Sequence, residues 1–408
     1  MGNAPVSDWA SDYDILDPGY VRNPYPVWDA LRTECPVAHS DRWGGSFLPT
    51  RYADIAAIAH DVEHFSSREI GVLRVDETAE PVPGSALPPG IGLPPIDADP
   101  PVHGWARRLI LPWFSRTRVD GYEPKTRELC NALIDEIIAN GHGDAATDYA
   151  QRIPVRVISW ILGVPDELSD TFTGWVRDAL EFGHIPERSG PAWGSVAAFF
   201  TTALEQRKAS PGDDLISDLL RAEVDGAPVS DTHILGTVAL ALVAGVDTTW
   251  SGIGAAMLHL ATHDDDRRRL VDDLTLIPVA IEELLRAYSP VTMARVATTG
   301  AEIAGCPFRE GDKVLLNFAA ANRDPAAFER ADEVIIDRAQ NRHIAFGVGI
   351  HRCAGSNLAR MELRVAVETW LQRLPHFHLA DGADVTWAGG QVRGPRTIPL
   401  RFTAAVAS

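Results

Sequence analysis

One long apolar segment limits the possible folds more than any other feature of the sequence. Ser230 and Asp231 are suited to begin a helix, and helical spacing continues from them to about His263. That is roughly 33 residues, against a usual mean of about 11–12. Residues 236–246 are apolar on nearly every side of such a helix. We therefore expect it to run through the body of the protein, because the apolar run before Asp247 is too short for a membrane span.

The remaining patterns predict a mainly helical protein with a minor β part. Helices are expected within residues 25–57, through most of 102–220 with breaks at prolines, at 277–288, and after Cys353. Strands are expected near 46–50, 295–299, 301–303 and 313–316, and in the tail at 378–403. Residues 79–101 contain too much proline and glycine for regular structure. The sequence contains no internal repeat, so a single domain over residues 1–408 is predicted.

Charge and cysteine content disfavour several classes of protein. The chain has 37 basic and 56 acidic residues and a net charge of −19, which argues against a nucleic acid or a membrane as partner. The four cysteines, at positions 35, 130, 306 and 353, form no CxxC pair. A zinc finger or a disulfide framework is therefore not expected, and the cytoplasm is the predicted location. The N-terminus lacks the pattern of a signal peptide or anchor.

The segment around Cys353 carries the clearest chemical signal. Residues 346–355 read FGVGIHRCAG, with two glycines before the cysteine and Gly355 after it. Glycines permit a tight turn in which the backbone comes close to a flat partner. Cys353 directly precedes a predicted helix, whose amide dipoles favour the thiolate form of the sulfur. A thiolate surrounded by backbone donors suits an iron ligand.

This segment resembles the cysteine-ligand loop of the cytochrome P450 family, the haem-thiolate monooxygenases. It matches the family pattern Phe-Gly-x-Gly-x-His-x-Cys-x-Gly at every fixed position, which disfavours the alternative of a buried structural cysteine. The resemblance implies the cytochrome P450 fold, with the long central helix over haem b and Cys353 as the iron ligand. Phe346, Gly347 and Gly355 are then expected at the cofactor. The other three cysteines are interpreted as small apolar fillers.

A Glu-x-x-Arg pair lies about 70 residues before the cysteine loop. Glu283 and Arg286 share a helix face and can form a salt bridge. Alone, this spacing is uninformative, but the family has such a pair at this place. The resemblance implies a structural role with an arginine from the irregular segment that follows, for which Arg338 is preferred over Arg342.

The centre of the long helix carries polar residues in an apolar setting. Residues 244–249 read AGVDTT, and an acid buried there without use is costly. A threonine hydroxyl can bind the carbonyl four residues back and open the helical turn. In the family this pattern delivers protons to dioxygen, so the resemblance assigns catalytic roles to Asp247 and Thr248. The alternative is a satisfied polar pair that bends a helix.

Four cationic or hydrogen-bonding residues match family positions that hold the haem propionates. His103 and Arg107 are spaced to share a helix face, and carboxylates favour such partners. The resemblance adds Arg295, from the strand after the Glu-x-x-Arg helix, and His351. A lone histidine on a helix is usually not a ligand, so the inference depends on the four together.

The resemblance also implies the reaction: one oxygen atom from O2 enters a small hydrophobic molecule, and the other leaves as water. We expect the electrons to come from a separate, acidic ferredoxin-type donor, because no flavin or iron–sulfur motif is present. Five arginines flank the predicted docking face: Arg107, Arg108, Arg116, Arg352 and Arg360. Two alternatives remain, a peroxide-driven haem peroxygenase and a non-catalytic haem sensor or carrier.

The substrate pocket is predicted from family positions. It is expected to involve the loop 68–96, residues 291–293, the loop near Gln391, and the following side chains: Phe182, Leu240, Val243, Ala244, Thr248, Val291 and Val392. Most are apolar, which predicts a hydrophobic substrate. Arg68, Arg74 or His184 are candidates to bind a substrate carboxylate, although solvated charges are the preferred interpretation.

Overall fold

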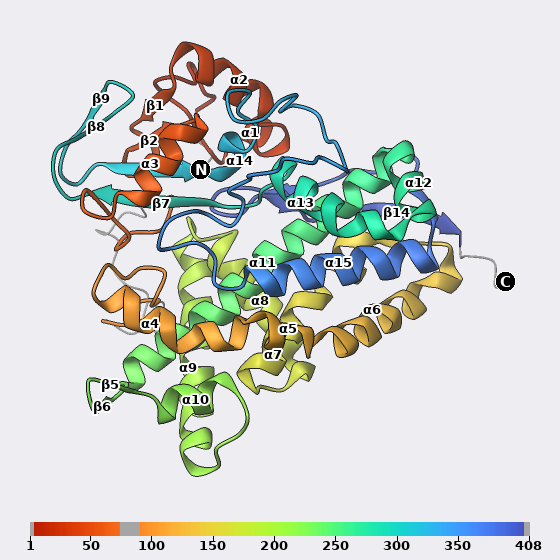
Figure 1. Cartoon of the computed structure of the whole chain (residues 1–408), viewed down its shortest axis with the longest axis horizontal. Coiled ribbons are helices and arrows are strands. Elements are labelled where there is room, and N and C mark those ends of the chain that lie inside the picture. The colour runs from red at the N-terminus through yellow and green to blue at the C-terminus, as the bar shows by residue number, and fades with distance from the viewer. Residues whose placement is uncertain (1–3, 74–89, 404–408) are drawn as a thin grey trace.

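Helices form most of the molecule, and the strands of the largest sheet lie together toward one side of it (Figure 1). The computed structural model describes residues 4–73 and 90–403. The mainly helical fold with a minor β part is confirmed. Residues 74–89, which include Arg74 and part of the expected pocket loop, lie outside the described residues.

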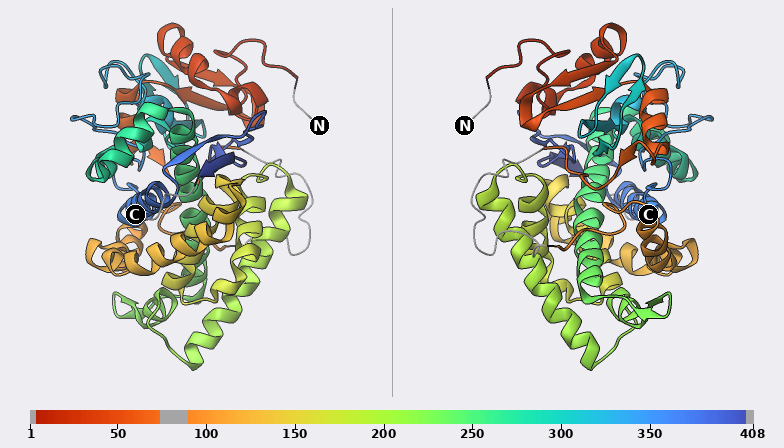
Figure 2. Two further views of the ribbon diagram at one scale, coloured as in Figure 1. Left: turned by 90° about the vertical axis from the view of Figure 1, so that its right-hand side faces the viewer. Right: turned by 90° about the vertical axis from the view of Figure 1, so that its left-hand side faces the viewer.

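The long helix predicted at 230–263 is present as α11, Asp231–Thr262. Ser230 caps it, its side-chain oxygen accepting a hydrogen bond from the backbone N–H of His233 at 3.3 Å. Both side views show α11 passing through the middle of the protein (Figure 2). The whole helix, unlike the shorter stretch considered above, is long and apolar enough to cross a bilayer. Because 72% of its most apolar window is buried inside the protein, α11 is a core helix.

The helices packed around α11 bury most of its surface. The direct neighbours come from both halves of the chain: α7 (Arg152–Leu162), α8 (Ser169–Leu180), α9 (Pro186–Ala209), α10 (Leu215–Arg221) and α15 (Ser356–Arg373). The other helices on this side are α4 (Val102–Ile110), α5 (Arg116–Asp120), α6 (Glu123–Ile137), α12 (Asp264–Asp272) and α13 (Ile277–Ala287). One continuous apolar core joins them.

A mixed five-stranded sheet forms the other side of the molecule. Its order is β1 (Val37–Ser40), β2 (Ser46–Pro49), β10 (Lys313–Asn317), β7 (Thr292–Ala297) and β3 (Phe65–Ser66). The surrounding helices are α1 (Pro18–Arg22), α2 (Tyr25–Glu34), α3 (Tyr52–His60) and α14 (Phe318–Ala321). Strand β7 begins earlier than predicted, and β1 was not predicted at all. Antiparallel pairing of β10 and β7 sets Val314 opposite Arg295.

Smaller sheets complete the β part. A three-stranded sheet joins β11 (His376–Leu379), β14 (Pro399–Thr403) and β4 (His142–Asp144). Three hairpins remain: β5 (Glu223–Val224) with β6 (Ala227–Pro228), β8 (Ala301–Ile303) with β9 (Cys306–Phe308), and β12 (Trp387–Ala388) with β13 (Gly394–Pro395). The segment 322–355 contains no helix or strand, as expected, and it leads directly into the cysteine loop.

Candidate active site

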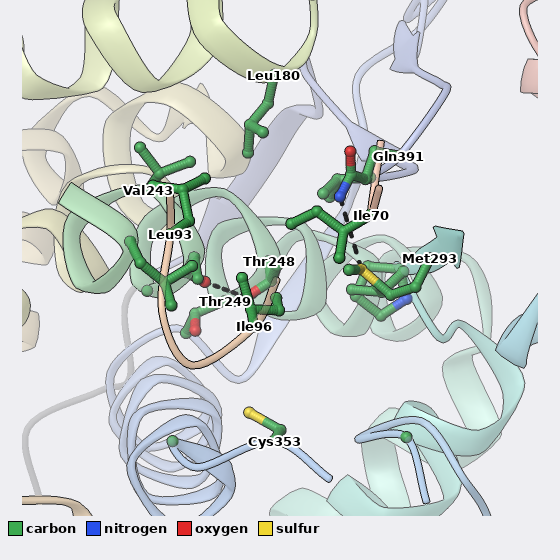
Figure 3. A pocket seen from close by; sticks show the side chains of 18 of the residues that line it. Ile70, Leu93, Ile96, Leu180, Val243, Thr248, Thr249, Met293, Cys353 and Gln391 are labelled. Atoms are coloured by element: carbon green, nitrogen blue, oxygen red, sulfur yellow. Dashed lines mark hydrogen bonds between the residues drawn. The ribbon is translucent and has the colours of Figure 1, made fainter. Parts of the chain in front are cut away.

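A largely apolar cavity of about 490 Å³ lies between α11, the cysteine loop and the small hairpin near the C-terminus. Figure 3 shows Cys353 on one side of it, with Thr248 and Thr249 of α11 above the sulfur and Gln391 farther away. Segments far apart in the sequence therefore line the same cavity. The arrangement suits a flat cofactor on the sulfur side with a small molecule next to α11.

The cysteine loop brings its sulfur to the cavity through a strained glycine turn. Gly347 and Gly349 have φ values of 69° and 76°, a region that other L-residues rarely adopt. A Cβ on Gly349 would also lie 2.5 Å from the carbonyl oxygen of Ala59. The N–H of Cys353 donates to the carbonyl of Phe346 at 2.8 Å. The turn therefore requires glycine at both positions.

The surroundings of Cys353 act on its thiol in opposite directions. Burial raises the pKa of the thiol, while the backbone N–H of Gly355 and the charges of Arg107, Arg352 and Arg360 lower it. The Cys353 side chain lies inside the protein but borders the cavity, so its sulfur is accessible from that cavity. A sulfur with one amide donor and nearby cations can serve as a thiolate ligand once a metal ion binds.

The four predicted propionate partners meet beside this sulfur. The rings of His103 and His351 lie 4.3 Å apart, and Arg107, Arg295 and His351 line the cavity. Burial lowers the pKa of Arg295 to about 10 and that of His351 to about 3, in the latter case with help from the neighbouring cations. Ser67 lies 2.9 Å from Nε2 of His351, a hydrogen bond that the sequence did not indicate.

These groups fit an anionic partner. Nε2 of His103 is buried without a hydrogen-bonding partner among the described residues. Arg295 is 5% exposed, and its side chain donates to the carbonyl of Ala294, its own neighbour, at 2.7 Å. A buried guanidinium that no carboxylate contacts directly is costly, and so is a buried imidazole nitrogen without a hydrogen bond. The two carboxylates of haem would supply both partners, so the residues present fit this cofactor.

Asp247 and Thr248 point to different surroundings. Thr248 lines the cavity, and its hydroxyl donates to the carbonyl of Ala244 at 2.8 Å, as the sequence predicted. Asp247 is not among the residues that line the cavity; its Oδ1 accepts a hydrogen bond from Arg396 at 2.7 Å. Burial raises the pKa of Asp247, and Arg396 opposes that shift. Oδ2 of Asp247 is buried without a partner among the described residues.

Arg396 is the functional residue that the sequence did not reveal. It also binds Glu181 at 3.0 Å and Ser251 at 3.1 Å, and its guanidinium lies 4.2 Å from the ring centre of Trp250. Its main partner in α11 is 149 positions away, so no local pattern could have identified it.

The Glu283 network holds the irregular segment against α13. Both Glu283 and Arg286 are completely buried and are joined by two hydrogen bonds of 2.8 Å. Arg338 donates a hydrogen bond to Glu283 at 2.9 Å, as preferred from the sequence. The backbone carbonyl of Arg342 instead accepts a hydrogen bond from the hydroxyl of Tyr52. Arg286 also donates to the carbonyls of Asn322, Ala331 and Glu333. The chain leading to Cys353 is thereby fixed.

Most of the predicted pocket residues line the cavity, but Phe182 does not. Those present are Leu240, Val243, Ala244, Thr248, Val291, Met293, Gln391 and Val392, together with parts of 70–73 and 93–96. Phe182 instead packs its ring under the guanidinium of Arg188, 3.3 Å from the ring centre. This cation–π partner in the first turn of α9 draws the ring away from the cavity. Leu180, two residues earlier, faces the cavity in its place.

The five arginines expected on the docking face have different environments. Arg108, Arg116 and Arg352 are exposed. Arg107 is turned inward to the cavity and donates to the carbonyl of Arg352. Arg360 is held by Glu282 through two hydrogen bonds of 2.6 and 2.8 Å. Glu282 thus neutralises the charge of Arg360. The two residues are 78 positions apart, so no local sequence pattern indicated this pair.

The cysteine, the buried cations and the apolar cavity together define a haem-thiolate enzyme. Comparison with known proteins agrees. The family model for cytochrome P450 matches residues 187–385. The chain is 35% identical over 359 residues to a probable cytochrome P450 127A1 of Sinorhizobium fredii, covering 88% of this chain and 84% of that protein. It is 34% identical to a vitamin D(3) 25-hydroxylase of Pseudonocardia autotrophica, covering 95% and 96%.

Solved structures give the same assignment. Cytochrome P450 CYP109Q5 from Chondromyces apiculatus superposes with a TM-score of 0.84 at 32% identity, covering 98% of this chain and 100% of that one. CYP109E1 from Bacillus megaterium, solved with testosterone, gives 0.85 at 28% identity, covering 94% and 99%. The chain belongs to the cytochrome P450 family, and it is a monooxygenase whose cofactor is haem b.

Proposed function

We propose that this monooxygenase inserts one oxygen atom from O2 into a hydrophobic small molecule, with electrons from a separate ferredoxin and reductase. The observation that carries the proposal is the apolar cavity that has Cys353 on one side and Thr248 of α11 on the other. When bound, haem supplies the activation of dioxygen, and electron donation from a thiolate ligand favours cleavage of the O–O bond.

In this proposal the residues around the cofactor hold and orient it. Cys353 is the iron ligand, fixed by the glycine turn and by the N–H of Gly355. His103, Arg107, Arg295 and His351 bind the propionates, and Phe346, Gly347 and Gly355 lie against the ring. Burial of Arg295 supports the assignment, because a bound carboxylate would neutralise its charge, and both histidines can hydrogen-bond to a carboxylate.

Asp247 and Thr248 are proposed to deliver protons. The hydroxyl of Thr248 faces the cavity while it bonds to the carbonyl of Ala244, which leaves its oxygen able to accept a further hydrogen bond. Asp247 keeps one carboxylate oxygen without a partner among the described residues. Because burial raises the pKa of Asp247, this acid is easier to protonate near neutral pH than an exposed one.

The substrate is proposed to be hydrophobic. Aliphatic side chains dominate the cavity wall, among them Ile70, Leu93, Ile96, Leu180 and Val243. Relatives support a molecule of this kind, since they include proteins described as a vitamin D(3) 25-hydroxylase and a steroid C26-monooxygenase.

The electron donor is proposed to be an acidic ferredoxin in the cytoplasm. Arg108, Arg116 and Arg352 supply exposed positive charge near Cys353 in a chain of net charge −19. Three exposed apolar side chains, Val102, Leu111 and Ile350, come from the same two segments. An apolar patch bordered by cations suits a small acidic protein.

Two measurements test the proposed function. The reduced, carbon-monoxide-bound absorption spectrum of the purified holoenzyme is expected to be that of a thiolate-ligated haem. Oxidation driven by NADH, ferredoxin and reductase is then compared with oxidation driven by peroxide. Faster turnover with peroxide alone would support the peroxygenase alternative, and loss of the thiolate spectrum would refute the assigned ligand.

A further inference from the structure

The polar side chains of the cavity are distributed unevenly between its two sides. The arginines that line it, Arg107 and Arg295, lie with His351 on the sulfur side, where the propionates are proposed to bind. On the opposite side, Glu181 is the lining carboxylate, and it is paired with Arg396 and Arg177. Among the described residues, that side offers no cation for an acidic ligand.

Two of the three candidate carboxylate receptors named from the sequence, Arg68 and His184, do not change this distribution, and the third, Arg74, lies outside the described residues. Arg68 has an 82% exposed side chain next to Asp99, at 3.5 Å. His184 places its ring edge against Trp43, with ring centres 5.7 Å apart, and is not among the lining residues. A carboxylate in this part of the cavity would lose its hydration without gaining a counter-charge from the residues that the structure describes.

Gln391 is an uncharged polar side chain that reaches the cavity far from Cys353 (Figure 3). Among the described residues, its carboxamide makes one hydrogen bond, from Nε2 to the sulfur of Met293 at 3.6 Å. A thioether is a weak acceptor. The carboxamide is therefore available to exchange this partner for a better one on a ligand.

The backbone of Gln391 is held firmly although its side chain is not. Its carbonyl accepts from the N–H of Thr292 at 3.0 Å, and Val392 forms a β-bridge with Val291. The N–H of Arg393 donates to the carbonyl of Pro290 at 2.7 Å. A polar group on a fixed backbone at the far side of an apolar cavity can select the orientation of a ligand.

We propose that the substrate is an uncharged, mostly apolar molecule with one hydroxyl or ketone oxygen, which Gln391 binds at the end distant from the oxidised carbon. Ile70, Leu93, Ile96 and Val243 contact the apolar body between that oxygen and the cofactor. A carboxamide both donates and accepts, so it suits either oxygen group. The proposal rests on the proposed monooxygenase function of the same cavity.

The test uses four probes with the same apolar ring: cyclododecane, cyclododecanol, cyclododecanone and cyclododecanecarboxylate. Their dissociation constants are measured from the change in ferric haem absorption of the holoenzyme. The ratio of the ketone constant to the hydrocarbon constant is compared between the wild type and Gln391→Leu. Loss of one neutral hydrogen bond is expected to shift this ratio by about 3- to 10-fold. The carboxylate is expected to bind more weakly than the ketone in both proteins.

A matched control is Met293→Leu, which removes the sulfur partner but keeps the carboxamide. It is expected to retain the preference for the ketone. An unchanged ratio in Gln391→Leu, tightest binding by the carboxylate, or no binding by any probe would overturn the proposal. These outcomes remain separate from the proposed function, because the carbon-monoxide spectrum of each variant tests the haem-thiolate site independently.

Discussion

The two sides of the cavity are held by different kinds of interaction. Around Cys353, backbone geometry and buried charges fix the chain, with Gly347 and Gly349 at positive φ and Glu283 paired with Arg286 behind the loop. On the other side, aliphatic side chains such as Leu180 and Ile70 meet the cavity with few directional contacts. The first side tolerates few substitutions, because each residue satisfies a specific geometry. The second tolerates exchange among apolar residues of similar volume.

The largest effect is expected from Cys353→Ser. A serine hydroxyl is a far weaker iron ligand than a thiolate, so the spectrum of a thiolate-ligated haem and NADH-driven turnover should both be lost. Absorption of the reduced carbon-monoxide complex measures the first, and product formation measures the second. Circular dichroism should remain that of the folded wild type. Unchanged absorption in this variant would refute Cys353 as the ligand.

Glu283→Ala should be the most destabilising of the changes behind the loop. It leaves Arg286 and Arg338 without their carboxylate, and Arg286 is fully buried. Removing one partner of such a pair costs about 3–5 kcal/mol, measurable by denaturant unfolding. Asp337→Asn is the control, since Asp337 pairs with Arg269 where both side chains are about half exposed, and it should cost less than about 1 kcal/mol. Equal costs would contradict the structural role of the network.

Asp247→Asn tests whether the long helix delivers protons. The amide keeps an acceptor for Arg396 but cannot supply a proton, so turnover should fall about 100-fold while substrate binding stays constant. Steady-state kinetics and a larger solvent isotope effect report the change. Ser251→Ala is the control, because Ser251 also binds Arg396. A similar loss of turnover in that control would assign the effect to Arg396 rather than to the acid.

The sequence predicted the cysteine side of the cavity better than the opposite side, for a physical reason. The loop 346–355 needs particular residue types at fixed spacing, and the hydroxyl of Thr248 binds a carbonyl within its own helix. Such local requirements leave a pattern in the sequence. The contact of Arg396 with Asp247 depends on tertiary packing between distant segments, and no local pattern records it.

Gly245 and Phe182 show the same limit. A glycine inside a helix weakens it, but a Cβ at Gly245 would lie 3.2 Å from the side chain of Ile158, so this glycine permits close packing of α11 on α7. Phe182 was expected in the pocket, but Arg188 holds its ring elsewhere. The sequence pattern predicted the helices that contain or flank Gly245 and Phe182. The packing of each residue, however, depends on neighbours that only the fold brings close.

Glu362→Gln should sharpen the comparison, because Glu362 is a buried, incompletely hydrogen-bonded group of α15, the helix that follows the cysteine loop. It lies in α15, is 1% exposed, and has an oxygen without a partner among the described residues. Burial raises the pKa of Glu362 well above its usual 4.5. The folded wild type therefore loses stability as the pH rises above 4.5, the usual pKa that Glu362 has in the unfolded chain, whereas the variant has no such group to titrate. Unfolding free energies should favour the variant by about 1 kcal/mol or more at pH 8 and converge near pH 4. A constant difference across pH would contradict this account.

The smallest effect is expected at the surface nearest Cys353. Arg352→Glu reverses an exposed charge beside the loop, so the KM for an acidic ferredoxin should rise about fivefold at low salt, with little change at high salt. The control is Arg268→Glu on α12, an equal charge reversal at a 68% exposed side chain outside the docking segments. Since the peroxide-driven reaction needs no protein donor, Arg352→Glu should change it far less than it changes the ferredoxin-driven reaction. If both reversals weaken the reaction equally, the overall charge steers the donor, and the cysteine side has no local docking surface.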